Sequence, residues 1–292
     1  MSHPKVSICI PTYKQPDFFR RALQSVFVQS FDDYEVIITD DSPDESVEHV
    51  VKEFQPNIKL KYYRNKERKG SPENWNEAIR LASGEYIKIL HHDDWFPDKN
   101  SLIEFVKMLD ENPNADFAFC SSLVCGPDQK VKYLHLPTEK QLSKLRSSSN
   151  YLFPKNIVGA PSATIYRSKL NKRFDIRLKW VVDIDFYISV LKDNKNFIFC
   201  SNPLVCTTDG APHQVTSECQ NDKNIELFEW FYLYDKIKKY PIIDFRNFVF
   251  FWNLLYKYKV RSVGEIKELG IQFPPQILEA IVQLQKILCT FR

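Results

Sequence analysis

The chain has 292 residues, of which 43% are hydrophobic and 26% charged, a composition typical of a globular protein with one large domain or a domain and an appendage. Its 40 basic and 37 acidic residues nearly cancel, so no global field attracts nucleic acid, and we expect no nucleic-acid partner. It has only 7 glycines and contains neither G-x-G-x-x-G nor G-x-x-x-x-G-K, which excludes the glycine-rich phosphate cradles of dinucleotide-binding and P-loop proteins.

The start of the chain and its cysteines indicate a cytoplasmic protein. The segment MSHPKVSICIPTYK reaches strand-like sequence at Lys5 and lacks a charged start followed by a long apolar stretch, so we expect no secretory signal. The 7 cysteines are odd in number and have no paired C-x-x-C spacing. We therefore expect reduced core residues, rather than zinc ligands or disulfides, at Cys9, Cys120, Cys125, Cys200, Cys206, Cys219 and Cys289.

Strand and helix patterns alternate along the first part of the chain. Hydrophobic spacing predicts strands at residues 5–10, 34–39, 59–63 and 85–90, and helices at residues 16–29, 42–54 and 72–82. This rhythm predicts a doubly wound α/β sheet. Ligands of such sheets bind beyond the carboxyl ends of the strands, which here are residues 11–13, 40–44 and 91–95.

The middle of the chain is less regular. We expect a helix at residues 101–110, a strand at 116–125, a strand at 162–167, a helix at 183–192 and a strand at 197–201. Two polar segments, residues 130–150 and 201–224, are predicted to be loops, the second of them over the site.

The last part of the chain is rich in aromatic residues and has a helical pattern. We expect a first domain of residues 1–224 and a helical extension of residues 225–292. Thirteen aromatic residues lie between Phe228 and Tyr258, and the longest stretch without charge there is ten residues, too short to span a bilayer. Three uses stay open for the extension: packing on the first domain, self-association into a homo-oligomer, and peripheral contact with a membrane surface.

Two acidic pairs stand at expected strand ends. Asp40 and Asp41 close the second strand, and Asp93 and Asp94 close the fourth within the run HHDD. Adjacent carboxylates repel each other unless a cation or hydrogen-bond donors meet them. Each pair alone is compatible with a helix cap or a turn. Two such pairs at two strand ends of one sheet favour a ligand or metal site.

The ordered motifs VSICIPTYKQ, YEVIITDDSPDES and GSPENWNEAIRLASGEYIKILHHDDWFPD together resemble the N-terminal half of family 2 glycosyltransferases. The likeness covers about residues 5–98 closely and extends more loosely through residues 183–217. It implies the GT-A fold, a doubly wound mixed sheet. It also implies a metal-dependent inverting transfer of a sugar from a nucleotide-diphosphate sugar to a hydroxyl of a glycan or lipid-linked acceptor. Cell-surface polysaccharide synthesis at the inner face of the cell membrane would be the setting.

The resemblance assigns the nucleotide side of the site to the ends of the first two strands. Pro11, Thr12 and Tyr13 match the loop beside the base and ribose of the donor. Asp41 matches the aspartate that hydrogen-bonds the base, and Asp40 stands beside it. The family most often binds a uridine-type or deoxythymidine-type base. Side chains, rather than glycine-rich amides, would then hold the nucleotide.

The resemblance places the diphosphate and a divalent metal, Mn²⁺ or Mg²⁺, near the run HHDD. This run aligns with a D-x-D-D segment, in which Asp94 contacts the metal and Asp93 lies near the ribose. The first aspartate of that segment is replaced by His91, which either joins the metal site or only packs. Arg68 and Lys69 lie in a loop that often places a basic residue near the diphosphate, although a solvated charge run is the common alternative.

The resemblance also implies a catalytic base on the acceptor side. Asp183 matches the base in an E-D-x-D pattern, with Val182 where a glutamate is frequent; a helix cap is the alternative role. Asp185 would support structure or acceptor binding. His213, in a late loop, would complete the metal site or touch the diphosphate, and residues 156–162 would form the floor of the acceptor pocket.

Two other functions stay open on the sequence alone. A sugar-nucleotide nucleotidyltransferase shares a similar α/β body, but it would carry a glycine-rich loop after the first strand, where this chain has PTYKQP. A non-catalytic module that binds a nucleotide sugar would explain the departures at His91 and Val182. Released nucleotide in the presence of donor distinguishes an enzyme from a binding module.

Overall fold

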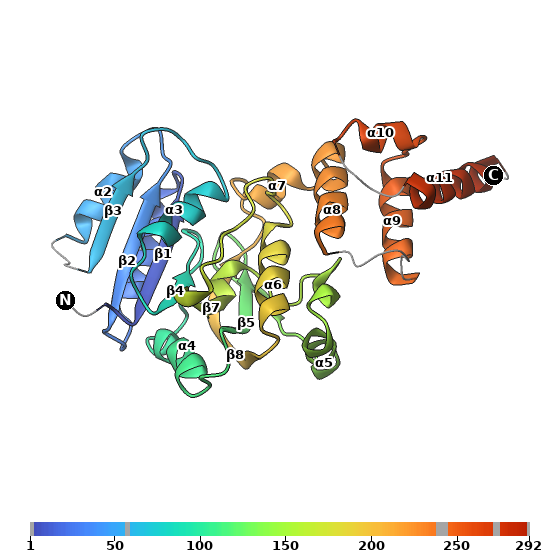
Figure 1. Ribbon diagram of the computed structural model, residues 1–292. Coiled ribbons are helices and arrows are strands. Elements are labelled where there is room, and N and C mark those ends of the chain that lie inside the picture. The colour runs from blue at the N-terminus through green and yellow to red at the C-terminus, as the bar shows by residue number, and fades with distance from the viewer. Residues whose placement is uncertain (1–2, 56–58, 238–244, 271–274, 291–292) are drawn as a thin grey trace.

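The computed structural model describes residues 3–55, 59–237, 245–270 and 275–290 (Figure 1). The N-terminal part alternates strands and helices close to the predicted positions. In chain order these elements are β1 (Val6–Thr12), α1 (Pro16–Phe27), β2 (Tyr34–Asp40), α2 (Ser46–Glu53), β3 (Leu60–Arg64), α3 (Glu73–Leu81) and β4 (Tyr86–Ile89). The βαβ prediction is confirmed here.

The second part of the body completes the sheet. Its elements are α4 (Ser101–Asp110), β5 (Phe117–Cys125), β6 (Val131–His135), α5 (Glu139–Ser147), β7 (Thr164–Arg167), α6 (Val182–Asp193) and β8 (Phe197–Thr208), with single 3-10 turns at Ser149–Leu152, Pro161–Ala163 and Ser168–Leu170. Within the described residues, one sheet runs β3-β2-β1-β4-β7-β5-β6, and β8 pairs with β5. Antiparallel pairing begins where β7 joins β4, so the sheet is mixed.

The strand register brings the expected ligand-binding ends together. β1 pairs in parallel with β2, placing Thr12 opposite Asp40, and β1 also pairs in parallel with β4. The carboxyl ends of these three strands therefore meet at one edge of the sheet, where the loops after them begin. The sequence-based expectation that residues 11–13, 40–44 and 91–95 share an edge is confirmed.

Alternate strand residues face the two covered sides of the sheet. Ile8 and Ile10 join a buried cluster with α1, α2 and α4, whereas Cys9 between them joins the cluster with α3 and α6. The cysteines with described side chains are Cys9, Cys120, Cys125, Cys200, Cys206 and Cys219. All of them are free, as expected, and all are buried except Cys200, which is partly exposed. The side chain of Cys289 lies outside the described part.

The two segments predicted to be loops are largely regular structure, so both predictions are wrong. Residues 130–150 form β6 and α5, and α5 begins with a capping box between Thr138 and Gln141. Helix α5 buries only Leu142 and Leu145, too few apolar residues to mark a helix in a polar sequence. Residues 201–208 continue β8 because they pair with β5, and a short helix, α7 (Val215–Cys219), follows.

The described residues of the C-terminal part form four helices, to the right of the sheet in Figure 1: α8 (Lys223–Ile237), α9 (Phe245–Lys257), α10 (Val263–Lys267) and α11 (Pro275–Thr290). In the described ranges, no helix is both long and apolar enough to cross a membrane. Helix α8 begins within two residues of the predicted boundary, at Lys223. The division into residues 1–224 and 225–292, the membrane contact and the self-association stay predictions.

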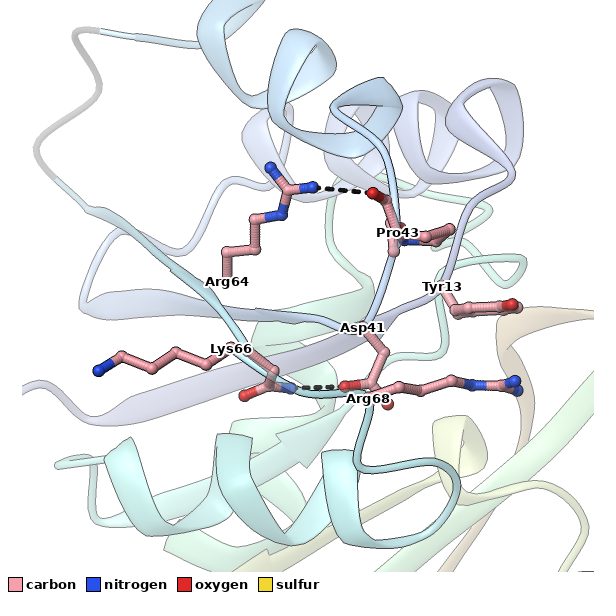
Figure 2. A pocket seen from close by; sticks show the side chains of 8 residues that line it. Tyr13, Asp41, Pro43, Arg64, Lys66 and Arg68 are labelled. Carbon is pink, nitrogen blue, oxygen red and sulfur yellow. Dashed lines mark hydrogen bonds between the residues drawn. The ribbon is translucent and has the colours of Figure 1, made fainter.

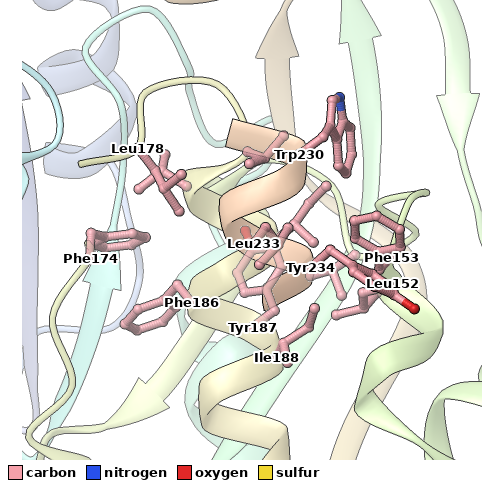
Figure 3. Close-up of a cluster of buried hydrophobic side chains, with 14 of the residues drawn as sticks. Leu152, Phe153, Phe174, Leu178, Phe186, Tyr187, Ile188, Trp230, Leu233 and Tyr234 are labelled. Carbon is pink, nitrogen blue, oxygen red and sulfur yellow. The ribbon is translucent and has the colours of Figure 1, made fainter. Parts of the chain in front are cut away.

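Most described aromatic residues of this part are packed in a buried cluster that also contains residues of the body. Figure 3 shows Trp230, Leu233 and Tyr234 of α8 gathered with Tyr187 and Ile188 of α6 in one buried cluster. Tyr240 lies outside the described residues, and two aromatic side chains, Phe245 and Tyr256, are exposed. The other members of the series are buried in this cluster or packed against it: Phe228, Trp230, Phe231, Tyr232, Tyr234, Phe248, Phe250, Phe251, Trp252 and Tyr258.

Candidate functional site

A pocket opens beyond the carboxyl ends of β1 and β2, where the sequence predicts nucleotide binding. Figure 2 shows the residues that line it, which come from the ends of β1, β2 and β3 and from the loop after β3. They are Tyr13, Asp41, Ser42, Pro43, Arg64, Asn65, Lys66 and Arg68. The pocket therefore combines one aromatic ring, one carboxylate and three basic side chains, a set suited to a base and a charged leaving group.

Asp41 is the fixed acidic group of this pocket. One of its carboxylate oxygens accepts hydrogen bonds from Asn65 Nδ2 at 2.7 Å and from the Lys69 backbone N–H at 3.1 Å. The other oxygen accepts the backbone N–H of Gly70 at 2.7 Å. Gly70 has φ +74°, which glycine adopts without strain. The loop after β3 thus folds onto Asp41 and holds its carboxylate in one orientation.

Asp40, Pro11 and Thr12 lie beneath the pocket rather than in its lining. Asp40 is fully buried and accepts hydrogen bonds from the Ser42 backbone N–H at 2.8 Å and from Tyr62 Oη at 2.8 Å. Thr12 Oγ1 donates to Asp40 at 3.2 Å. These contacts hold the ends of β1 and β2 in place. The structure therefore gives Asp40 an internal set of partners, while Tyr13 and Asp41 face the cavity.

The two basic residues singled out in the sequence differ in position. The Arg68 guanidinium lies 4.2 Å from the centroid of the Tyr13 ring and lines the pocket. Lys69 donates its backbone N–H to Asp41, whereas its ammonium pairs with Glu77 at 3.1 Å. Arg68 is thus available to a phosphate, and the Lys69 side chain is engaged on α3.

Replacing Arg68 with alanine should weaken the binding of a nucleoside diphosphate by about 10-fold or more, the usual effect of losing one charge-assisted hydrogen bond. Lys66→Ala is a matched control, because Lys66 lines the same pocket but points away from Tyr13 in Figure 2. Titration calorimetry with UDP and GDP in the presence of Mn²⁺ measures both variants. Equal losses for the two variants would contradict a specific role of Arg68.

A second group of polar side chains follows β4. One ligand atom each from His91, Asp93 and Asp94 lies within 4.8 Å of the others. The Asp94 carboxylate accepts the Thr208 backbone N–H at 2.9 Å, and Arg21 donates to the backbone oxygen of Asp93 at 2.7 Å. The end of β8 and helix α1 therefore hold this group at the edge of the sheet.

The chemistry of this group fits a divalent cation. Burial and the adjacent charge of Asp93 raise the pKa of Asp94. Burial opposes ionisation of Asp93, yet contact with His213 holds its pKa below the usual range. Burial also lowers the pKa of His91 to about 4, which leaves a neutral imidazole. His91 Nε2 is shielded from solvent and has no hydrogen-bond partner among the described residues. Two carboxylates and a free imidazole nitrogen are donors that Mn²⁺ accepts.

His213 lies beside this group. Its Nε2 is 3.5 Å from the Asp93 carboxylate, and its ring packs 4.9 Å from Phe18. Gln214 Nε2 also donates to Asp93, at 3.2 Å. The segment after β8 thus closes onto Asp93, and His213 contacts the group at Asp93.

Asp183 lies in the first turn of α6, where two hydrogen bonds hold its carboxylate. One of its carboxylate oxygens accepts a hydrogen bond from Asn156 Nδ2 at 2.7 Å, and the other accepts one from the Ile184 backbone N–H at 2.8 Å. Burial raises the pKa of Asp183 to about 7. A carboxylate with a pKa near the working pH is suited to accept a proton from a hydroxyl.

Residues 156–162 connect Asp183 with the group after β4. Asn156 binds Asp183, and Ser162, at the other end of the segment, accepts the His91 backbone N–H at 2.9 Å and hydrogen-bonds the Asp94 carboxylate. The sequence predicts this segment as the floor of the acceptor pocket. In the structure it joins the two groups of ionisable side chains.

Sequence reasoning missed the asparagines that organise the pocket. Asn74 lies in the first turn of α3, is buried, and donates to the backbone oxygens of Thr12 and Thr39 at 3.1 Å each. Asn65 bridges Asn74 and Asp41. Asn74 falls in the first turn of the predicted helix, where asparagine is common, so no sequence pattern marks its role.

Comparison with known proteins places the site in a family of enzymes. The chain is 28% identical over 202 residues to an uncharacterized glycosyltransferase of Methanocaldococcus jannaschii, covering 68% of each chain. It is 28% identical to a putative colanic acid biosynthesis glycosyl transferase of Escherichia coli, covering 65% of this chain and 67% of that protein. It is also 33% identical to an undecaprenol-linked glycan β-1,3-glucosyltransferase of Campylobacter jejuni, over 31% of this chain and 30% of that protein.

Solved structures share the fold. S. aureus TarS in complex with UDP-GlcNAc superimposes with a TM-score of 0.62 at 18% identity, covering 87% of this chain and 72% of that chain. The mannosyltransferase PcManGT from Pyrobaculum calidifontis, in complex with GDP-Man and Mn²⁺, gives a TM-score of 0.58 at 17% identity, covering 82% and 67%. The family model described as Glycosyl transferase family 2 matches residues 7–174, more than half of the chain. This protein belongs to glycosyltransferase family 2 and is a glycosyltransferase with the GT-A fold.

Proposed function

We propose that this enzyme transfers a sugar, with inversion and with a divalent metal, from a nucleotide-diphosphate sugar to a hydroxyl of a glycan or lipid-linked acceptor in cell-surface polysaccharide synthesis. The observation that carries the proposal is residues 156–162, which contact both Asp183 and the group of His91, Asp93 and Asp94. One short segment thus contacts both the proposed base for the acceptor and the proposed ligands for a cation at the leaving group. The names of the E. coli and C. jejuni relatives support the acceptor class.

On the donor side, the pocket residues would bind the nucleotide. Asp41, whose orientation is set by three hydrogen bonds, would accept an N–H of the base. The Tyr13 ring would pack beside the base or ribose, and Arg68 above it would bind a phosphate oxygen. Glycine-rich amides are not needed, because these contacts are made by side chains.

His91, Asp93 and Asp94 would hold the divalent cation, with His213 supporting Asp93. When bound, such a cation neutralises the negative charge that develops on the departing diphosphate. The residues themselves place two carboxylates and one neutral imidazole at the sheet edge before any substrate arrives. The fixed arrangement avoids reorganisation during the reaction.

Asp183 would act as the general base. Its carboxylate takes the proton of the acceptor hydroxyl as that oxygen forms a bond to the anomeric carbon. The bond from this carbon to the diphosphate oxygen breaks, and the electron pair leaves with the nucleoside diphosphate. Attack comes from the face opposite the diphosphate, so the anomeric configuration inverts. Asn156 Nδ2 donates a hydrogen bond of 2.7 Å to the Asp183 carboxylate and keeps it oriented.

The rate should depend on pH through Asp183. We expect kcat to rise with pH and level off above about 7, because only the ionised carboxylate accepts a proton and burial raises its pKa to about 7. Below this value kcat should fall about tenfold per pH unit. The measurement is kcat at saturating donor across the neutral range. A flat profile through pH 7 would contradict Asp183 as the base.

A donor screen tests the proposed function directly. Purified protein is incubated with UDP-, GDP- and dTDP-sugars and Mn²⁺, and the released nucleoside diphosphate is measured with and without glycan acceptors. We expect release from one donor class, abolished by a chelator. Binding of a nucleoside diphosphate without any release would instead favour the non-catalytic module.

A further inference from the structure

Helix α8 carries a buried carboxylate that contacts the turn before α6. The Glu229 side chain is only 2% exposed. Its carboxylate accepts three consecutive backbone N–H groups, from Lys179 at 2.8 Å, Trp180 at 2.9 Å and Val181 at 3.0 Å. A buried carboxylate is costly unless its oxygens are satisfied, and here donors reach both of them.

These N–H groups lead directly into α6, which begins at Val182 and carries Asp183 in its first turn. The first N–H groups of a helix have no partner within the helix, and a side chain near its start normally satisfies them. The residue that precedes α6, Val181, provides no such side-chain cap. Glu229, from a different helix, accepts the N–H of Val181 and those of the two residues before it, and so fixes the turn from which α6 starts.

A neighbouring acid on α8 shows that the contact is specific to Glu229. Glu226 is also buried, at 3% exposed, but its carboxylate binds Lys257 of α9 at 2.8 Å and the Asn221 backbone N–H at 2.8 Å. The two glutamates thus attach α8 to two different parts of the protein. Glu226 holds it to the other C-terminal helices, and Glu229 holds it to the turn that carries Asp183.

Further contacts make α8 a rigid support for α6. Lys236, near the end of α8, pairs with Asp185 of α6 at 2.7 Å and with Asp175 at 2.9 Å. Apolar side chains of both helices, among them Leu233 and Tyr187, also pack together in the buried cluster of Figure 3. Asp185 therefore has a structural partner on α8. Glu229 and Lys236 thus hold α8 at two points along its length, which restricts movement of Glu229 relative to α6.

We propose that Glu229 is a positioning residue for the reaction, which holds the turn of residues 179–181 so that Asp183 meets the acceptor hydroxyl. This inference rests on the proposed role of Asp183 as the base. Reorientation of a catalytic group by about 1 Å lowers rates by up to about 100-fold, so a loosened turn is expected to affect turnover more than folding. The C-terminal helices are then part of the catalytic apparatus rather than a passive appendage.

The test compares Glu229→Gln with the matched control Glu226→Gln. A glutamine amide presents N–H groups to backbone N–H donors, so Glu229→Gln breaks part of the contact with little change of volume. We expect kcat to fall about 10- to 100-fold with the donor found in the screen, while the affinity for UDP or GDP with Mn²⁺ stays within about twofold. Amide hydrogen exchange at residues 179–183 should accelerate in this variant and not in Glu226→Gln.

Asp183→Asn, assayed in parallel, separates the two hypotheses. If Asp183→Asn is inactive while Glu229→Gln turns over like Glu226→Gln, the positioning role is wrong and the base assignment stands. If Asp183→Asn is fully active, the base assignment itself is wrong. Should Glu229→Gln fail to fold, Glu229→Asp keeps the charge and withdraws the carboxylate by one methylene. Wild-type kcat and wild-type exchange at residues 179–183 in that variant would overturn the proposal.

Discussion

Asp183→Asn is expected to lower kcat for sugar transfer by about 1000-fold, within the range for loss of a general base. An asparagine amide has nearly the same shape but takes no proton at neutral pH. Nucleotide affinity should be unchanged, because Asp183 contacts Asn156 and Ile184 and none of the residues that line the pocket near β1 and β2. The measurement is nucleoside diphosphate release, together with calorimetric titration of UDP and GDP.

Asp193→Asn is the control for this variant. Asp193 lies in the last turn of the same helix, α6, is exposed, and pairs with Lys172 at 2.6 Å. An exposed ion pair contributes little to stability, so the control should keep wild-type kcat and melting temperature. Unchanged turnover in Asp183→Asn would exclude Asp183 as the base. Equal losses in both variants would point to a general effect on α6.

Asp94→Asn is expected to abolish the response to Mn²⁺ and to lower kcat by about 100-fold or more, as removal of a metal ligand removes transition-state charge stabilisation. A ligand that binds only the folded protein raises the melting temperature, so Mn²⁺ should stabilise the wild-type protein and not this variant. With a chelator present, the variant should be no less stable than the wild type, because the repulsion between Asp93 and Asp94 is relieved.

Asp98→Asn serves as the control for Asp94→Asn, since Asp98 is exposed and lies shortly after the same strand. It should retain both turnover and the Mn²⁺-dependent rise in melting temperature. A wild-type thermal response to Mn²⁺ in Asp94→Asn would contradict its assignment as a ligand. The same measurement on His91→Ala decides between a ligand and a packing role for this imidazole, whose ring lies 4.5 Å from that of Trp75.

The structure also links the C-terminal helices to the site in a way that their composition does not indicate. From the sequence alone, their aromatic residues predict packing, self-association or contact with a membrane, and most of those described are packed. The contact with functional consequences is polar: Glu229 binds backbone N–H groups about fifty residues earlier in the chain. Truncation within α8 would therefore remove a support of Asp183 as well as apolar packing.

The sequence by itself determined the alternating architecture and the edge where the site lies. Strands and amphipathic helices produce local periodicities, and β1, β2 and β4 end in short polar motifs that can be located without any tertiary information. Because parallel strands place their carboxyl ends at one edge, Tyr13, Asp41 and Asp94 could be assigned to the same region. The family motifs added the roles expected of these residues.

Only the tertiary structure decided which side chains face the site and what holds them. Asp40 and Asp41 are adjacent in sequence, yet one is buried under the pocket and the other lines it, because neighbouring residues at a strand end point in different directions. The regular structure of residues 201–208 depends on pairing with β5, which no local pattern contains. The contact of Glu229 with the turn before α6 likewise joins distant segments through backbone N–H groups, which carry no sequence signal of their own.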